Sequence, residues 1–165
     1  MAQQHKNWSF VFVGPRVNLR ECTPLVEQLA HLPNVYFLGS KPLNMLPAYT
    51  QHLDVCMLCY ELDGYTKYIN PLKLHEYLAS GRPTIGSPIP ICLDFAHVIN
   101  LAQTPEEWAT AIEKALSPTT NSPEQIAARR RVARQHDWNI LVRKIAEALC
   151  KRLGPTYLER FEKLP

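Results

Sequence analysis

The stretch Asn70-Pro-Leu-Lys-Leu-His-Glu-Tyr-Leu-Ala-Ser-Gly81 decides the fold, because it contains both ends of one well-defined helix. Asn70 is a suitable N-cap, Pro71 is a suitable first residue, and Gly81 supplies the C-terminal stop. Leu74, Tyr77 and Leu78 give the helix its apolar stripe. The first amides of such a helix have no partners within the helix and carry the positive end of its dipole, so they are suited to bind a phosphate.

Short apolar runs on both sides of this helix predict buried strands. They cover residues 8–14, 34–39, 54–60, 82–86 and, more weakly, 97–101. Helices are expected after Thr23-Pro24 and over residues 46–53, 70–80, 105–116, 123–135 and 138–153. The alternation predicts an α/β fold, a Rossmann-like doubly wound parallel sheet with helices on both faces. We expect this domain to span residues 8–153, with a disordered segment at 1–7 and a tail at 154–165.

Composition limits the classes of function. The 165 residues carry a net charge of +3, which suits an anionic ligand and is far from the dense basic surface of a nucleic-acid binder. Cys56 and Cys59 have the spacing of a redox or zinc motif, but on a strand their side chains point to opposite faces. We therefore expect free thiols, a reducing compartment such as the cytoplasm, and no metal site. No apolar run approaches the length of a membrane span.

Lys73, Glu76 and Ser80 fall on a second side of the central helix. A carboxylate at Glu76 is able to accept hydrogen bonds from the two vicinal hydroxyls of a ribose, and Lys73 would bring a mobile positive charge near the phosphates. The alternative is that Lys73 and Glu76 form an i,i+3 ion pair on an exposed surface helix. Spacing alone leaves both interpretations open.

The order of segments resembles the C-terminal domain of GT-B glycosyltransferases of family four. The likeness covers residues 8 to 150, and the segments that carry it are residues 10–15, 32–39, 53–60 and 71–83. In that family the domain binds a nucleoside-diphosphate sugar, often a UDP-sugar. The resemblance therefore implies sugar transfer from such a donor, with retention of the anomeric configuration and without a cofactor or a required metal.

The resemblance also assigns roles to residues. Glu76 matches the second of two glutamates separated by seven residues, the one that grips the ribose. The first glutamate faces the donor sugar in the family, and its position here is Tyr68, so the identity of the sugar is undefined. Phosphate binding is implied for Gly14, Asn70, Pro71, Leu72 and Lys73, and base binding for Gly39, Ser40 and Lys41.

Two departures from the family bear on activity. Family domains open with one more strand and helix than residues 1–7 can supply, and the N-terminal domain that binds the acceptor has no counterpart here. The catalytic residues, including a proposed acid/base histidine, are therefore unknown and expected in that missing domain. We expect this chain to bind the donor with little turnover, and the acceptor, a glycan or a lipid-linked glycan, to be bound elsewhere.

Other features allow further interpretations. The arginines from Arg129 to Arg134 are expected to form a solvated face, or else a contact with an anionic membrane at the inner face of the cell envelope. The last helix is amphipathic, so it would either cover its own sheet or expose an apolar patch that favours a homodimer. A non-catalytic association module and a nucleotide-sugar epimerase-like domain are the alternative functions.

Overall fold

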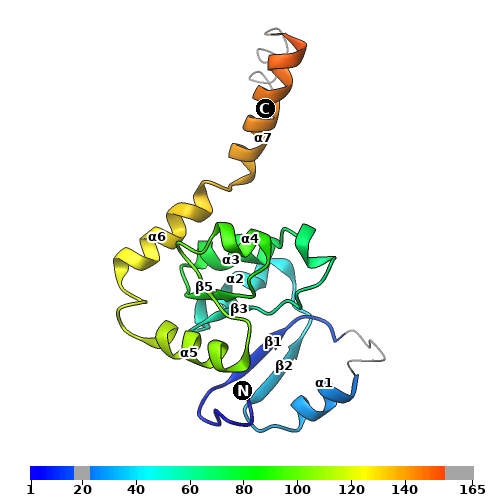
Figure 1. Ribbon diagram of the computed structural model, residues 1–165, viewed down its shortest axis with the longest axis vertical. Helices are drawn as coiled ribbons and strands as arrows, with labels where there is room; N and C mark the ends of the chain where they lie inside the picture. The colour runs from blue at the N-terminus through cyan, green and yellow to red at the C-terminus, as the bar shows by residue number, and fades with distance from the viewer. Residues whose placement is uncertain (17–22, 155–165) are drawn as a thin grey trace.

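The structure, a computed structural model, describes residues 1–16 and 23–154 (Figure 1). Parallel strands alternate with helices along the chain, which confirms the α/β class. The strands are β1 (Phe10–Val13), β2 (Val35–Gly39), β3 (Cys56–Leu58), β4 (Thr84–Gly86) and β5 (Asn100–Leu101). The α-helices are α1 (Thr23–Ala30), α2 (Leu46–His52), α3 (Leu72–Ser80), α4 (Pro90–Asp94), α5 (Pro105–Leu116), α6 (Pro123–Arg134) and α7 (Trp138–Leu153), with short 3₁₀ turns η1 (Leu43–Met45) and η2 (Thr66–Tyr68).

The strands form two separate parallel pieces rather than one continuous sheet. β1 pairs with β2, and β3, β4 and β5 pair in that order. The register of the first piece shifts between Phe12 and Val13, where β1 approaches its carboxyl end. Every pair is parallel, so the carboxyl ends of neighbouring strands within each piece lie at the same edge.

Helices cover both faces of the three-stranded piece, as the apolar strands predict. Successive side chains of a strand point to opposite faces, and each face has its own apolar cluster. Leu58 contributes to the cluster under α3 and α4, which consists of Leu58, Leu74, Leu78, Ile89, Cys92, Phe95 and Ile99. Ile85 contributes to the cluster under α5, which consists of Ile85, Ala102, Trp108, Ala111, Ile112 and Ala115.

Helix α3 ends as the sequence predicts but begins one residue later. Gly81 adopts the left-handed conformation with φ of 82°, which stops the helix. Pro71, expected as the first helical residue, is instead the N-cap with ψ of 120°, and no side chain caps this end. The proline ring fixes φ only, so an extended ψ at Pro71 moves the helix start to Leu72 and leaves Asn70 outside.

Two other expectations differ from the structure. Residues 1–7, expected to be disordered, form turns held by the buried Asn34 side chain, whose Nδ2 donates to the carbonyls of Ala2 (3.0 Å), His5 (3.1 Å) and Trp8 (3.0 Å). Helix α4 was not expected, and it has only five residues, beginning at Pro90. It packs directly on β4, since a Cβ on Gly86 would lie 2.9 Å from Cys92 Sγ.

Helix α7 extends away from the rest of the molecule (Figure 1). None of its residues is buried, whereas α6, which precedes it, packs on α3. Of the two outcomes expected for this amphipathic helix, the structure shows the exposed apolar stripe. The tail expected at residues 154–165 lies, apart from Gly154, outside the described residues.

Candidate functional site

The turns after β1 and β2 meet at the carboxyl edge of their piece of sheet. The Gly14 amide donates to the Gly39 carbonyl at 3.0 Å, so a residue expected near the phosphates adjoins one expected near the base. Gly14 has φ of 145° and Gly39 has φ of 69°, backbone angles that residues other than glycine rarely adopt. Ser40 is exposed and Lys41 is half-buried beside them.

Two cations lie near the same turns. The guanidinium carbon of Arg16 stands 4.1 Å from the centre of the Phe37 ring, and Lys41 Nζ lies 5.8 Å from the centre of the Tyr49 ring. Arg16 was not among the residues predicted for the site. Its signal in the sequence is its position directly after Gly14-Pro15, where a strand ends at the edge that binds ligands in doubly wound folds.

The carboxyl ends of β3 and β4 are joined through Ser87. The Tyr60 amide donates to Ser87 Oγ at 2.9 Å, and the Ser87 amide donates to the Leu58 carbonyl at 3.0 Å. Ser87 is 5% exposed, so these bonds fix where the chain leaves β3. Ser87 therefore positions Tyr60, and sequence reasoning missed it because the two residues lie 27 positions apart.

Thr66 holds together the loop of residues 61–69. Its buried hydroxyl donates to the Glu61 carbonyl at 2.8 Å and accepts from the Asp63 amide at 3.0 Å. The Thr66 amide and hydroxyl, which bond to Asp63, lower the pKa of the Asp63 carboxyl. This network fixes the loop and leaves the Tyr65 and Tyr68 side chains exposed, 76% and 88% respectively.

A hollow of about 480 Å³ lies between this loop and the start of α3. It brings together three of the predicted site residues, Tyr68, Asn70 and Pro71. The remaining lining comes from two further tyrosines and one apolar side chain, Tyr60, Tyr65 and Ile69. The hollow is open and aromatic, and it adjoins the N-terminal end of α3.

The N-terminal end of α3 presents unpaired polar groups to the solvent. The first amide to bond back is that of Leu74, which donates to the Pro71 carbonyl at 3.0 Å, so the amides of Leu72 and Lys73 precede the first bonded turn. Glu76 is exposed one turn further along, while Leu74 and Leu78 are fully buried. The alternative i,i+3 ion pair is not formed, since the side chains of Lys73 and Glu76, both in the described part of the chain, have no hydrogen-bond or ion-pair partner.

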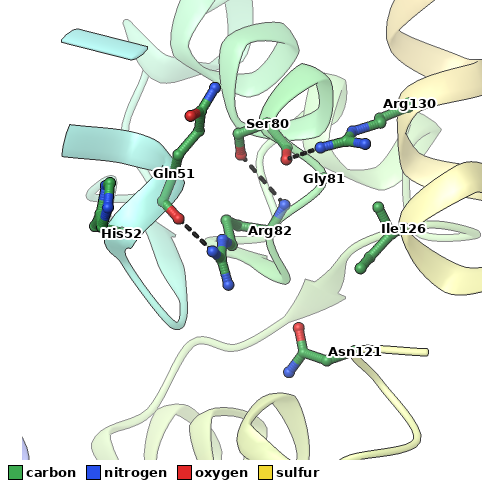
Figure 2. A pocket seen from close by; sticks show the side chains of 8 residues that line it. All are labelled: Gln51, His52, Ser80, Gly81, Arg82, Asn121, Ile126 and Arg130. Carbon is green, nitrogen blue, oxygen red and sulfur yellow. Dashed lines mark hydrogen bonds between the residues drawn. The ribbon is translucent and has the colours of Figure 1, made fainter. Parts of the chain in front are cut away.

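A second hollow of about 420 Å³ lies at the opposite, amino edge of β4 (Figure 2). It is lined by Gln51, His52, Ser80, Gly81, Arg82, Asn121, Ile126 and Arg130. Figure 2 shows its two guanidinium groups directed at helix ends: Arg82 donates to the Gln51 carbonyl at the end of α2, and Arg130 donates to the Ser80 carbonyl at 3.1 Å. These cations satisfy the last carbonyls of two helices, which is a structural role.

The arginines of α6 were expected to form a solvated face, but the first of them, Arg129, is buried. Arg129 is 3% exposed, and its guanidinium donates to the Gly81 carbonyl at 2.8 Å and the Thr120 carbonyl at 2.9 Å. It was misassigned because the charge run gives no sign of which arginine faces the packed surface between α6 and α3. Arg130, Arg131 and Arg134 are exposed.

The histidines and cysteines of the described residues form no group of three potential metal ligands. His75 stacks on His136 with ring centres 4.8 Å apart, and both contact Phe95. Cys56 in β3 is buried, whereas Cys59, just past the end of β3, is exposed, and burial raises the pKa of the Cys56 thiol to about 12. Within residues 1–16 and 23–154, no helix is both long and apolar enough to cross a membrane.

Comparison with known proteins shows similarity at the level of family and fold. Residues 1–118 match the family described as glycosyl transferases group 1. The TuaH protein of Bacillus subtilis (strain 168), whose name assigns it to teichuronic acid biosynthesis as a glycosyltransferase, is 30% identical over 148 residues. That match covers 87% of this chain and 36% of TuaH.

Two solved structures share the fold. They are crystal structures of Anabaena Alr3699/HepE, one in complex with UDP (TM-score 0.65) and one with UDP and glucose (TM-score 0.67), each with 16% sequence identity. The matches cover 87% and 90% of this chain but only 41% and 42% of the HepE chains. With a parallel α/β fold, an amide-rich helix end at the carboxyl edge and a family match over residues 1–118, this chain belongs to the glycosyl transferases of group 1.

Proposed function

We propose that this chain is the donor-binding half of a glycosyltransferase that takes a sugar from a nucleoside-diphosphate sugar, with UDP as the nucleotide. The observation that carries the proposal is the free N-terminal end of α3, which adjoins an open hollow at the carboxyl edge. A helix end of this kind binds diphosphate through amides and dipole. The UDP present in both HepE structures supports the choice of nucleotide.

Each part of the donor has a proposed partner. The turn formed by Gly39, Ser40 and Lys41 would bind the base, and the exposed Glu76 carboxylate would accept the ribose hydroxyls. The phosphates would lie between Gly14 and the first residues of α3, with Asn70, Pro71, Leu72 and Lys73 around them. Tyr68 would contact the donor sugar.

In the reaction, these residues would stabilise the leaving group. During transfer, the bond between the anomeric carbon and the diphosphate oxygen breaks, and negative charge develops on the diphosphate. The amides of Leu72 and Lys73, the Lys73 ammonium and the Arg16 guanidinium would stabilise that charge without a metal ion. The acceptor, a glycan or a lipid-linked glycan as the TuaH likeness suggests, would be bound by a part of the enzyme outside this chain.

Calorimetric titration with UDP tests the proposal. Wild-type protein should bind UDP, and Glu76→Gln should weaken the affinity by about tenfold, because an amide replaces a charged acceptor of two hydrogen bonds. Glu113→Gln, which changes an exposed carboxylate on α5, is the matched control and should bind as the wild type does. Wild-type protein that takes up no UDP at millimolar nucleotide would refute the proposal for this chain.

A second candidate function, association without catalysis, is favoured by α7. Its apolar stripe is exposed, with Trp138 at 66%, Ile145 at 58% and Leu149 at 52%. Two copies that pair through this stripe would bury it. Sedimentation should then show a concentration-dependent homodimer that Ile145→Glu abolishes, together with no affinity for UDP.

We also propose a cytoplasmic location at the inner face of the membrane. The exposed arginines of α6, Arg130, Arg131 and Arg134, would contact anionic lipid there. Cosedimentation with phosphatidylserine vesicles tests the contact, which should weaken when Arg131 and Arg134 are both changed to glutamine. Equal binding of the variant and the wild type would argue against it.

A further inference from the structure

Two exposed tyrosines lie on one side of a 3₁₀ turn, at the hollow before α3. Tyr65 and Tyr68 stand at the two ends of η2, and the Tyr68 amide donates to the Tyr65 carbonyl at 3.1 Å. In a 3₁₀ turn, side chains three positions apart lie on the same side. Both tyrosines line the hollow of about 480 Å³, although their side chains are 76% and 88% exposed. Large aromatic side chains exposed together in this way are typical of a binding surface.

The floor of the same hollow is anchored on the hydrophobic core. Tyr60 and Ile69 are half-buried, and both pack against the apolar cluster under α3 and α4. Burial raises the pKa of Tyr60, and the neighbouring Cys92 and Tyr65 raise it further. The Tyr60 phenol therefore lies near that of Tyr65, so a buried ring and an exposed ring meet in the hollow.

The turn that carries the exposed tyrosines is fixed by other groups. The Thr66 hydroxyl donates to the Glu61 carbonyl at 2.8 Å, and the Thr66 amide donates to Asp63 Oδ1 at 2.7 Å. Turn η2 also packs on α4. Within residues 1–16 and 23–154, the Tyr65 and Tyr68 rings make no contact with another aromatic ring. The two rings are thus held in position before any ligand binds, which lowers the entropy cost of binding.

The lining of the hollow suits a neutral sugar ring. It consists of three tyrosines with Ile69, Asn70 and Pro71, all in the described part of the chain, and none of these side chains is a carboxylate or a cation. A pyranose has a face of C–H groups that is bordered by hydroxyls. A tyrosine ring packs on such a face, while its phenol exchanges hydrogen bonds with the hydroxyls. The Asn70 amide adds further donors and an acceptor.

The hollow also lies where the sugar of a bound donor is expected. It shares Asn70 and Pro71 with the phosphate site proposed at the start of α3. In a nucleoside-diphosphate sugar, the sugar is bonded directly to the second phosphate, so it must lie next to that site. The inference that follows therefore rests on the proposed function.

We propose that Tyr65 and Tyr68 form an aromatic platform on which the donor sugar stacks, with Tyr60 at its base, and that this platform selects a neutral pyranose over a uronic acid. Tyr60 and Tyr65 would then determine specificity together with Tyr68. Recognition by stacking differs from recognition by a charged group, because the ring face contacts C–H groups that every neutral pyranose presents.

The charges around the platform give the preference against a uronic acid. A carboxylate on the sugar would find no cation among the lining residues. The loop that carries the platform contains two carboxylates, Glu61 and Asp63, and a single lysine, Lys67. An anionic sugar would therefore meet a net negative charge on this loop.

Calorimetric titration with UDP, UDP-glucose and UDP-glucuronate tests the platform. The quantity compared is the Kd for UDP divided by the Kd for UDP-glucose, because this ratio cancels effects of a substitution on the nucleotide. It should be about ten for the wild type and about three or less for Tyr65→Leu, since the stacked ring is lost. Tyr65→Phe keeps the ring and should restore the ratio. UDP-glucuronate should bind the wild type about threefold or more weakly than UDP-glucose does.

Trp138→Leu is the matched control, because it removes an exposed aromatic ring on α7, away from the hollow, and should keep the ratio of the wild type. A ratio near one for wild-type protein that binds UDP would overturn the platform and leave the proposed function standing. The same holds for a ratio that Tyr65→Leu does not change, and for UDP-glucuronate binding more tightly than UDP-glucose. Absence of UDP binding would refute the proposed function, and the platform with it.

Discussion

The buried guanidinium of Arg129 holds three segments together at the amino edge of the sheet. It reaches from α6 to the carbonyl of Gly81 at the end of α3 and to the carbonyl of Thr120. Arg129→Met should lower the free energy of unfolding by about 2–4 kcal/mol, because two buried carbonyls lose charged donors. Arg131→Met, at an exposed position on the same helix, should change it by less than about 0.5 kcal/mol in the same urea titration. Equal losses would mean that Arg129 has no special role.

His75 should make stability depend on pH. Burial, and then the neighbouring His136, lowers the pKa of His75 below its ordinary value of 6.5. The unfolded chain therefore takes up the proton first as pH falls. The contribution of His75 to stability is complete above pH 6.5 and is lost as pH falls through the lowered folded pKa.

Urea unfolding between about pH 5 and pH 7.5 measures this effect, since the window spans the ordinary histidine pKa. His75→Phe should reduce the loss of stability at the acidic end, because no proton is then taken up at this position. His31→Gln, at an exposed position in the turn after α1, should retain the pH dependence of the wild type. A His75→Phe profile parallel to that of the wild type would contradict the assignment.

At the scale of elements, the C-terminal end of α3 tolerates only glycine. A Cβ on Gly81 would lie 2.8 Å from Ile126 Cγ2 and 3.0 Å from Arg130 Nε, and φ is 82°. Gly81→Ala should therefore destabilise the fold by about 1–3 kcal/mol through strain and loss of the α3–α6 contact. Gly64→Ala is the control, because a Cβ there meets nothing within 4 Å. Thermal unfolding that shifts equally for both variants would be inconsistent with this contact.

Local signals predicted most helices and the strands near them. Thr104 forms a full capping box with Glu107, and Ser122 accepts from the Gln125 amide, so α5 and α6 begin where the sequence indicates. Helix α4 was missed because its helical conformation depends on packing against Gly86, a contact between residues that local propensity does not describe. The start of α3 was misplaced by one residue for a similar reason, since ψ of Pro71 is not fixed by its ring.

For the whole molecule, the sequence predicted the parallel α/β layers, and the residues expected at the site lie in two groups, one in each piece of sheet. The Gly14–Gly39 hydrogen bond and the hollow lined by Tyr68, Asn70 and Pro71 each lie at the carboxyl end of parallel strands, in separate pieces of sheet. The separation of the strands into two sheets was not predicted, because hydrophobic patterning indicates where a strand lies but not which strands pair with it. Ser87 and Arg16 were missed for the same reason, since their partners Tyr60 and Phe37 are distant in sequence.

Nucleotide is proposed to bind at the carboxyl edge, at the N-terminal end of α3. The most direct test is a titration of ¹⁵N-labelled protein with UDP, followed by amide chemical shifts. The largest changes are expected at Leu72, Lys73 and Ser40, with little change around the opposite hollow. Changes confined to Arg82, Asn121 and Arg130, which line the hollow at the amino edge, would contradict it.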